Sequence, residues 1–420
     1  MEALIRRQPE KGVTEPLLAV SQVVFVIFLC AGHFKANPAL AWLPFDLTVA
    51  AAGLALVLSA VYFFVTGARI RTEASCLAWF FASMALALFA TDWTPYAIEK
   101  GSRFFTLTLL AAFLPAVILT RLEGVRRFVL LVITLGMVLS AGVVLQLAAG
   151  GFTGGLDERT TGFATVTTSL AWDAGLALVG LYALTLRGGK WLWMSVPCLP
   201  LVVAIVASGA RAPLLVAPAV IALLTICFSR KQRSIAIALV LIAAGGLLFT
   251  RYSSLLPQGS VMRIQSFLQG QYDSSADERR NLNLVALEVI AKRPLGNGFG
   301  GFAHFYNFGG VTDQVYPHNI VLDIAVDNGI FVAALFVCIL AWAVRKSYLA
   351  ARITPDFQPL LGMLLFSLSN SLISGELNLD RMLFALLGIA LQADSLIAGT
   401  QGCGASTERV ANELSFADCG

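Results

Sequence analysis

Apolar residues fill the chain in blocks of about 20 residues, and short polar or basic stretches separate the blocks. A helix needs about 20 mainly apolar residues to cross the hydrocarbon core of a bilayer. The pattern therefore predicts about twelve transmembrane helices. The predicted spans lie near residues 15–35, 43–65, 74–92, 103–120, 128–149, 164–186, 191–209, 212–229, 234–250, 319–344, 357–375 and 381–398.

Composition favours a membrane protein over a soluble one. Of the 420 residues, 58% are hydrophobic and 13% are charged, and the mean hydropathy is +0.79. A soluble core cannot absorb this much apolar surface, so the sequence predicts an all-α polytopic membrane protein. It is expected to form one transmembrane helical domain at residues 1–398, followed by a polar, disordered cytoplasmic tail at 399–420.

Basic residues predict the orientation, because Lys and Arg are retained on the cytoplasmic side of short loops. With the N-terminus in the cytoplasm, most basic clusters fall on that side, from Arg6 and Arg7 to Arg345 and Lys346. We therefore expect both termini to be cytoplasmic. The opposite short loops then hold Lys35, Lys100, Arg103, Arg159, Arg211 and Arg381.

One long connection stands out at residues 251–318, between the ninth and tenth spans, and it is expected on the outer side. Within it, Ser275 and Glu278 have the spacing of a capping box, and Pro294 ends a helical pattern. The pattern predicts an amphipathic helix lying on the bundle with its charged face towards water. Its apolar positions are Leu282, Val285, Val289 and Ile290, and the basic residues of the whole loop are Arg251, Arg263, Arg279, Arg280, Lys292 and Arg293.

Arginines on the outer face are candidate anion ligands. Arg279 and Arg280 are predicted in the first turn of the loop helix, where backbone N–H groups favour an anion. Arg211, in "VASGARAPLLVAP", is predicted in a very short turn between two spans, and an arginine fixed there is suited to clamp a phosphate bidentately. The other interpretation of Arg211 is a rim residue that reaches bulk water.

The start of the tenth span, "VYPHNIVLDIAVDNG", is unusually polar. Asn319, Asp323 and Asp327 are spaced i, i+4, i+8, so they share one helix face. Such residues either line a water-filled cavity or form a hydrogen-bonded seam between helices, and the sequence leaves both open for the two aspartates. His318 stands at the outer rim with a pKa suited to proton transfer near neutral pH.

The glycine-rich stretch "GNGFGG" at 296–301 formally matches a dinucleotide-binding fingerprint. It follows a predicted helix instead of a strand, so we interpret it as a turn that leads back to the membrane. Its backbone N–H groups could still face a phosphate.

Metal chemistry is not expected. The sequence shows no metal-ligand cluster and no paired-carboxylate motif of the kind that holds a divalent cation near a diphosphate. The histidines at His33 and His304 are expected to be structural, and the cysteines to be small buried residues. We therefore expect no metal and no cofactor, so that arginines neutralise a leaving phosphate.

Three stretches, in order along the outer face, resemble the O-antigen ligase and polymerase superfamily of bacterial inner membranes. They are "SGARAPLL", "ERRNLNLVALEVIAKRPLGNGFGGF" and "YPHNIVLDIAVDNGIFVAALF". The resemblance spans about residues 205–337, and the twelve-span plan with one large periplasmic loop agrees with it.

This resemblance implies a metal-independent, inverting membrane glycosyltransferase of C-type architecture, with its active site facing the periplasm. The donor would be a glycan on undecaprenyl diphosphate. In the ligase branch the acceptor would be a sugar hydroxyl of the lipid A core, and no nucleic acid is involved.

Carried over by position, Arg211 and an arginine of the loop helix would hold the diphosphate, and His318 would be the general base on the acceptor hydroxyl. Family members often show an aromatic residue four positions after that loop arginine. Asn283 stands four after Arg279, so the sequence leaves the choice between Arg279 and Arg280 open. The candidate supporting residues are Tyr316, Asn319 and Asp323.

Alternatives remain at this point. A polymerase would extend the same lipid-linked glycan with the same parts, although the single large outer loop favours the ligase. A transferase that glycosylates periplasmic protein is a third version. From a different class, a transporter for an anionic lipid would place polar residues inside its spans. The residues that would support transport are Asp173, Ser367, Asn370, Ser371 and Ser374.

Overall fold

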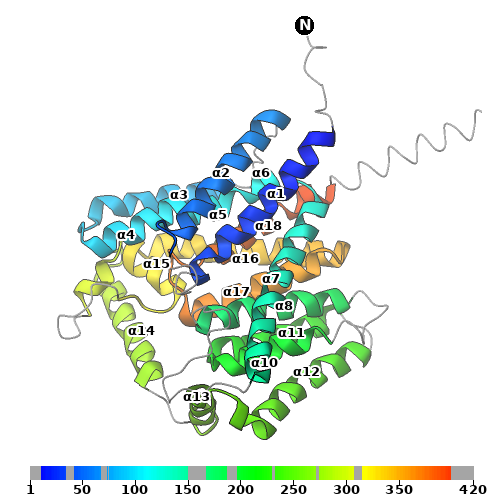
Figure 1. Cartoon of the computed structure of the whole chain (residues 1–420). Coiled ribbons are helices and arrows are strands. Elements are labelled where there is room, and N and C mark those ends of the chain that lie inside the picture. The colour runs from blue at the N-terminus through cyan, green and yellow to red at the C-terminus, as the bar shows by residue number, and fades with distance from the viewer. Residues whose placement is uncertain are drawn as a thin grey trace, which may run out of the picture.

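The computed structural model describes residues 11–34, 42–67, 73, 75–149, 167–186, 196–228, 232–270, 274–306 and 315–398. Over these residues the regular structure is helical throughout (Figure 1). The helices are α1 (Lys11–Cys30), α2 (Leu47–Thr66), α3 (Ser75–Leu86), α4 (Pro95–Arg103), α5 (Leu109–Phe113), α6 (Pro115–Ile118), α7 (Leu122–Ala148), α8 (Thr167–Thr185), α10 (Cys198–Ser208), α11 (Arg211–Phe228), α12 (Gln232–Arg251), α13 (Gln258–Leu268), α14 (Ser274–Lys292), α15 (Ile320–Asn328), α16 (Ile330–Ile353), α17 (Phe357–Ser374) and α18 (Arg381–Leu391).

Eight helices among the described residues are long and apolar enough to cross a membrane, which confirms the all-helical, multi-pass class. They are Thr14–Phe34, Leu47–Thr66, Pro95–Ile118, Leu122–Ala148, Thr168–Thr185, Arg211–Phe228, Ile330–Ile353 and Phe357–Ser374. Shorter apolar helices lie at Ser75–Ala90, Cys198–Ser208, Ile235–Arg251 and Arg381–Leu391, so the predicted number of twelve spans is not confirmed.

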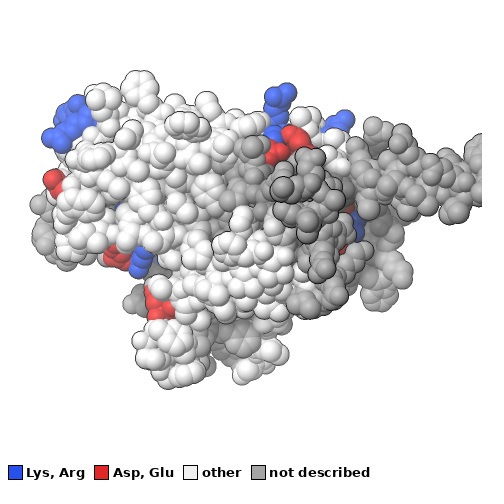
Figure 2. All heavy atoms as spheres, turned by 90° about the horizontal axis from the view of Figure 1, so that it is seen from above, with Lys and Arg blue, Asp and Glu red and all other residues white. Residues whose placement is uncertain are grey.

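On the face shown in Figure 2, charged side chains gather in the left and right parts of the view with uncharged surface between them. The proposed tail at 399–420 lies outside the described residues.

Aromatic side chains fill the centre where α3, α16 and α18 meet. The ring of Phe80 lies 5.1 Å from that of Phe336 and 6.2 Å from that of Phe384, centroid to centroid. Phe104 packs beside them, 6.3 Å from Phe80, and all four side chains are fully buried. Aromatic pairs at these separations stabilise a core beyond the area they bury. This core fixes the helices that carry the polar residues described below.

The helical segment that holds Lys100 begins earlier than the sequence predicts. The expected span started at residue 103, whereas α4 begins at Pro95 and continues through a π-helical turn and α5 to Ile118. Thr94 caps this start by accepting a hydrogen bond from the backbone N–H of Ala97 at 3.1 Å, and a proline is favoured at the first helical position. Lys100 therefore lies inside a helix and not in an outer loop, and its side chain is fully buried.

The predicted tenth span is divided into two helices. The helix α15 ends at Asn328, and α16 begins at Ile330, so the span 319–344 is wrong as a single helix. Gly329 separates them with a φ of +89°, and a Cβ there would lie 2.7 Å from the carbonyl carbon of Leu295. The backbone N–H of Ile330 donates to the carbonyl of Pro294 at 2.9 Å. The chain breaks here because the backbone at Pro294 and Leu295, just after α14, packs directly against it.

The loop helix is confirmed as α14. Its apolar face buries Leu282, Ala286 and Val289 in a small cluster with Phe302 and with Val326 of α15. In Figure 1 this helix lies at one end of the bundle, beside α15. The helix begins at Ser274, so Arg279 and Arg280 lie in its second turn, and the predicted attraction of the first-turn N–H groups does not apply to them.

Candidate functional site: an arginine-lined cavity

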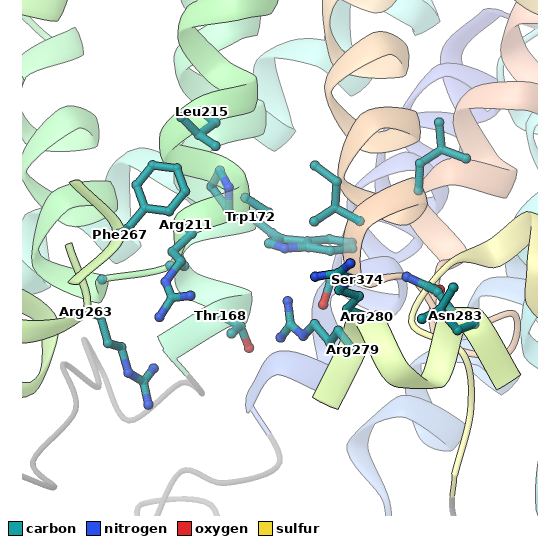
Figure 3. A pocket seen from close by; sticks show the side chains of 17 residues that line it. Thr168, Trp172, Arg211, Leu215, Arg263, Phe267, Arg279, Arg280, Asn283 and Ser374 are labelled. Carbon is teal, nitrogen blue, oxygen red and sulfur yellow. The ribbon is translucent and has the colours of Figure 1, made fainter. Parts of the chain in front are cut away.

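Four arginines from three separate segments line one cavity of about 580 Å³. Arg211 comes from the start of α11, Arg263 from α13, and Arg279 and Arg280 from α14. Figure 3 shows the guanidinium groups of Arg211 and Arg279 pointing into the same cavity from opposite sides. The structure thus brings together the arginines that the sequence singled out from separate stretches. Guanidinium groups arranged in this way are suited to a phosphate or diphosphate.

A tight turn places Arg211. The helix α10 ends at Ser208, Gly209 follows with a φ of +64°, and α11 begins at Arg211, which confirms the predicted very short turn. The Ser208 hydroxyl accepts a hydrogen bond from the backbone N–H of Ala210 at 3.1 Å. A Cβ on Gly209 would lie 2.7 Å from the Cα of Ser260, so only glycine permits α13 to pack so closely here.

Sequence reasoning did not assign a role to Arg263. The helix α13 is held against the α10–α11 turn by Ser260, whose buried hydroxyl donates to the carbonyl of Ala207 at 2.7 Å. This docking brings Arg263 and Phe267, further along α13, to the cavity wall. No motif marks Arg263, because its position depends on a contact between segments that are separated by the whole of α11 and α12.

The two arginines of α14 differ in their surroundings. Arg279 is half-buried and Arg280 is exposed. Asn283, one turn after Arg279, also lines the cavity, and its buried Oδ1 has no hydrogen-bond partner among the described residues. A buried oxygen without a partner can still accept a hydrogen bond from a ligand. Asn283 thus stands on the cavity wall, four positions after Arg279.

The remaining wall of the cavity comes from α8 and from the end of α17. Thr168 and Trp172 lie one turn apart on α8, and Leu372, Ile373 and Ser374 end α17. In Figure 3 the Trp172 ring lies beside the arginines of α14. An indole at this place offers a flat apolar surface next to the cationic groups.

His318 lies beside the cavity but is not among the residues that line it. Its backbone has a φ of +59°, a left-handed conformation that is uncommon outside glycine. The imidazole packs 4.2 Å from the Tyr316 ring, centroid to centroid, and its buried Nδ1 has no hydrogen-bond partner among the described residues. Burial, followed by the positive charge of Arg279, lowers the pKa of His318 to about 4. The imidazole is therefore neutral at physiological pH, and its pKa lies below the near-neutral value that the sequence predicts, because the ring is partly buried near Arg279.

Asn319 connects His318 to the cavity wall. Its Oδ1 caps α15 by accepting the backbone N–H groups of Val321 at 3.0 Å and Leu322 at 3.1 Å. Its Nδ2 donates to the carbonyl of Leu372 at 2.9 Å. This one side chain therefore starts the helix that follows the histidine and ties it to the end of α17.

The two aspartates of α15 form a buried seam and do not line an open cavity. Lys100 Nζ lies 2.7 Å from Asp323 Oδ1 and 2.6 Å from Asp327 Oδ2, and all three side chains are fully buried. Asp323 also accepts the backbone N–H of Leu377 at 3.0 Å. Of the two interpretations that the sequence left open, the structure favours the seam between helices. The interpretation of Asp323 as a residue of the site is therefore limited to positioning α15.

In the glycine-rich turn at 296–301, two backbone N–H groups already donate hydrogen bonds within the protein. Asn297 N donates to the carbonyl of Val326 at 2.9 Å, and Gly298 N donates to that of Asp327 at the same distance. Gly298 has a φ of +80°, and a Cβ on it would lie 2.5 Å from the carbonyl oxygen of Ala90. The stretch is therefore a turn that packs α15 against the loop, and these two groups do not face a phosphate.

Two buried carboxyl groups after α17 were not singled out from the sequence. The Tyr96 hydroxyl donates to Glu376 Oε1 at 3.1 Å, and the Glu376 side chain is buried. Burial raises the pKa of Glu376 to about 7 and that of Asp380 to about 8. Burial, followed by the negative charge of Glu376, also raises the pKa of the Tyr316 phenol above its usual range. This acidic segment therefore lies close to the Tyr316–His318 pair.

One group among the described residues has the geometry to hold a metal ion. Single ligand atoms of Cys30, His33 and Asp173 lie within 4.8 Å of one another. His33 Nδ1 lies 2.8 Å from Asp173 Oδ2, and Cys30 Sγ lies 4.0 Å from Asp173 Oδ1. These contacts satisfy the buried carboxylate from both sides, which also explains the polar residue within the α8 span. The pairing agrees with a structural role for His33.

The structure defines a multi-pass membrane protein with an arginine-lined cavity beside a half-buried histidine. The family model described as O-antigen ligase matches residues 196–337, about a third of the chain. The match covers α10, α11, α13, α14 and α15, and with them all four arginines and His318. It confirms the resemblance to the O-antigen ligase and polymerase superfamily and supports a ligase or polymerase type of activity. No curated protein matches the chain.

Proposed function

We propose that the protein is an O-antigen ligase of a bacterial inner membrane. It transfers a glycan from undecaprenyl diphosphate to a sugar hydroxyl of the lipid A core on the periplasmic face, with both termini in the cytoplasm. The observation that carries the proposal is the cavity lined by Arg211, Arg263, Arg279 and Arg280 next to His318. The family match over the same residues supports it.

The arginines act on the leaving group. As the bond between the anomeric carbon and the diphosphate breaks, negative charge grows on the departing oxygen. Fixed guanidinium groups from α11, α13 and α14 stabilise this charge more strongly in the transition state than in the bound donor. The leaving group is already good, so no general acid is needed, and four cations fill the role that a metal would otherwise have.

His318 acts on the acceptor. A sugar hydroxyl needs to lose its proton as it attacks the anomeric carbon, and a neutral imidazole can accept it. The positive charge of Arg279 contributes to the low pKa of His318, so a diphosphate bound beside Arg279 weakens that effect and raises the basicity of the imidazole. The base is thus strengthened when the donor is in place. A single displacement inverts the anomeric configuration, and retention would contradict this mechanism.

A polymerase would use the same cavity and the same base, and the family match supports either activity. A lipid transporter has less support. Ser367, Asn370 and Ser371 of α17 are buried, and Asn370 donates to the carbonyl of Phe366 in its own helix at 2.8 Å. Ser374 lines the arginine cavity instead. Asp173 of α8 pairs with His33. The contacts of Asn370 and Asp173 lie inside the bundle, as expected for residues with a structural role.

The test is a product assay with purified protein, undecaprenyl-diphosphate glycan and lipid A core, in the presence of a chelator. We expect transfer to the core by the wild type, and loss of transfer in His318→Ala and Arg211→Ala. Matched controls are His304→Ala and Arg251→Ala, which change exposed residues outside the cavity wall and should retain activity. Lengthening of the lipid-linked glycan without transfer to the core would identify a polymerase. If the protein forms no glycosidic product from any lipid-linked donor, both the ligase and the polymerase proposals are wrong.

A further inference from the structure

Cys30, His33 and Asp173 bring three different metal-binding atoms together where α1 meets α8. The ligand atoms all lie within 4.8 Å of one another. Cys30 is the last residue of α1, His33 lies in the 3-10 turn that follows it, and Asp173 lies in α8. Cys30 and Asp173 are buried, and His33 is partly exposed. None of the three lines the arginine cavity, so this group is separate from the proposed active site.

The stretch "CAGH" at 30–33 supplies two of the ligands from one helical turn. Residues at i and i+3 of a helix are neighbours on its surface, and two intervening residues are a common spacing for zinc ligands. Gly32, between the two ligands, has no space for a side chain, because a Cβ there would clash with the Arg381 guanidinium. The backbone of this turn is therefore closely packed. Asp173 completes the group from a helix that is 140 positions away from His33 in the sequence.

The distances between the ligand atoms are close to those around a tetrahedral zinc ion. Zinc binds sulfur at about 2.3 Å and nitrogen or oxygen at about 2.0–2.2 Å, which places neighbouring ligand atoms about 3.2–3.8 Å apart. His33 Nδ1 lies 2.8 Å from Asp173 Oδ2, and Cys30 Sγ lies 4.0 Å from Asp173 Oδ1. One distance is slightly too short and the other slightly too long. Side-chain shifts of less than about 0.5 Å therefore bring the three atoms to the zinc geometry.

The ligand types favour zinc over calcium or magnesium. Thiolate and imidazole are ligands for zinc and similar transition metals, whereas calcium and magnesium prefer sets of oxygen atoms. The Arg381 guanidinium, next to this turn, repels cations, so an ion held only by charge is disfavoured here. A thiolate from Cys30 and the Asp173 carboxylate together match the charge of a divalent ion. As a neutral thiol, Cys30 gains little, because a thiol is a weak donor and 4.0 Å is a long contact.

We propose that Cys30, His33 and Asp173 bind one zinc ion, which joins the end of α1 to α8. On binding, the Cys30 thiol releases its proton to water and its sulfur forms the bond to the metal. Water takes the fourth position of the tetrahedron. The His33 side chain is 25% exposed, which gives the ion a route to the site. The ion takes no part in glycan transfer, so the proposal holds whether or not the protein is a ligase.

Cobalt(II) is the probe for the site, because it accepts the same ligands as zinc and its bond to a thiolate absorbs light. Full-length protein is treated with chelator, freed of it and titrated with cobalt. We expect one equivalent to produce the thiolate-to-cobalt absorption, which zinc removes and excess magnesium does not. Cys30→Ala should abolish this absorption, and Cys338→Ala, which changes an exposed cysteine of α16, should retain it. Absence of the absorption in wild type, its persistence in Cys30→Ala, or its removal by magnesium would overturn the proposal.

The imidazole ligand is tested by affinity. His33→Gln should weaken cobalt binding at least about ten-fold, because one of three protein ligands is lost. The matched control is His304→Gln, since His304 lies 3.6 Å from Asp92 in an exposed pair that has no cysteine ligand among the described residues. Equal affinities for His33→Gln and wild type would contradict the assigned ligand set.

Thermal unfolding in detergent tests the connection between α1 and α8. Zinc should raise the unfolding midpoint of the wild type and leave that of Cys30→Ala unchanged, because a ligand that binds only the folded state stabilises it. In chelator the two proteins should unfold at similar midpoints, which shows that the variant folds. His33→Gln provides the same comparison through a partly exposed residue. Equal zinc-induced shifts in the wild type and in both variants would overturn the site.

Discussion

Lys100 of α4 and Asp323 of α15 form an ion pair of 2.7 Å between two fully buried side chains. The second oxygen of Asp323 accepts the backbone N–H of Leu377, so this pair joins α4, α15 and the segment after α17. The helix α15 begins directly after His318 and Asn319. The polar residues of α15 thus position the histidine, and Asp323 and Asp327 themselves are not among the residues that line the cavity.

Removing the cation of this seam should destabilise the fold strongly. In Lys100→Met two carboxylates remain buried without their partner, and breaking a buried ion pair in this way costs about 3–5 kcal/mol. Thermal unfolding in detergent should show a large drop in midpoint. The control is Lys292→Met, which removes an exposed pair with Glu288 and should leave the midpoint unchanged. Equal midpoints for Lys100→Met and wild type would refute the buried seam.

Stability should fall as pH rises towards 7, because buried carboxyl groups keep their protons in the folded state. The pKa of Glu376 is raised to about 7, whereas the unfolded chain releases this proton near pH 4.5. The stabilisation is complete below about pH 4.5 and is lost as pH rises through 7, with a slope of up to about 1.4 kcal/mol per pH unit. Unfolding midpoints of wild type and Glu376→Gln between pH 5 and 8 measure this difference.

Glu376→Gln should flatten the decline, since glutamine has no proton to release. Comparing the two proteins cancels the titration of other groups, including His318. The control is Glu288→Gln on the exposed side of α14, which should follow the wild-type curve. Parallel curves for wild type and Glu376→Gln would show that Glu376 is ionised in the folded protein.

The pH dependence of catalysis should separate Arg279 from Arg280. Because the pKa of His318 is about 4, kcat/KM should stay level down to about pH 5 and then fall as the imidazole becomes protonated. Arg279→Gln removes a positive charge that lowers this pKa, so the acid limb should move to higher pH. Arg280→Gln should weaken donor binding and leave the limb in place. A limb that moves equally in both variants would contradict the placement of Arg279 beside the base.

Two substitutions of Asn319 separate its role as the cap of α15 from its contact with Leu372. Asn319→Asp keeps the oxygen that caps α15 but loses the amide that donates to Leu372, whereas Asn319→Ala loses both contacts. We expect Asn319→Ala to lose about 1 kcal/mol of stability through the missing cap. Asn319→Asp should retain most of that stability and still lose transfer activity, because the wall at the end of α17 is no longer tied to the histidine. Equal activity of Asn319→Asp and wild type would limit the residue to capping.

Much of the site could be predicted from local signals in the sequence. Arg211 was expected in a short turn, and the α10–α11 connection confirms it. The apolar spacing of Leu282 and Val289 predicted a helix that buries one face, as α14 does. Each of these features depends on residues that are near one another in the chain.

The missed features depend on contacts between distant segments. Lys100 and Asp323 are separated by 223 positions. The helical spacing of Asp323 and Asp327 therefore could not show that Lys100 is their partner. Arg263 reaches the cavity only because α13 packs on the α10–α11 turn. The division of the tenth span at Gly329 results from the backbone at Pro294 and Leu295, which apolar periodicity does not record.

Separate measurement of donor binding and glycan transfer tests the central claim most directly. Purified protein in chelator is titrated with undecaprenyl-diphosphate glycan, and transfer to the lipid A core is followed in the same samples. Arg211→Ala should bind the donor at least about ten-fold more weakly than wild type, since a charge-assisted contact to the diphosphate is lost. His318→Ala should bind the donor like wild type and transfer no glycan. Wild-type binding by Arg211→Ala, or full transfer by His318→Ala, would contradict the account.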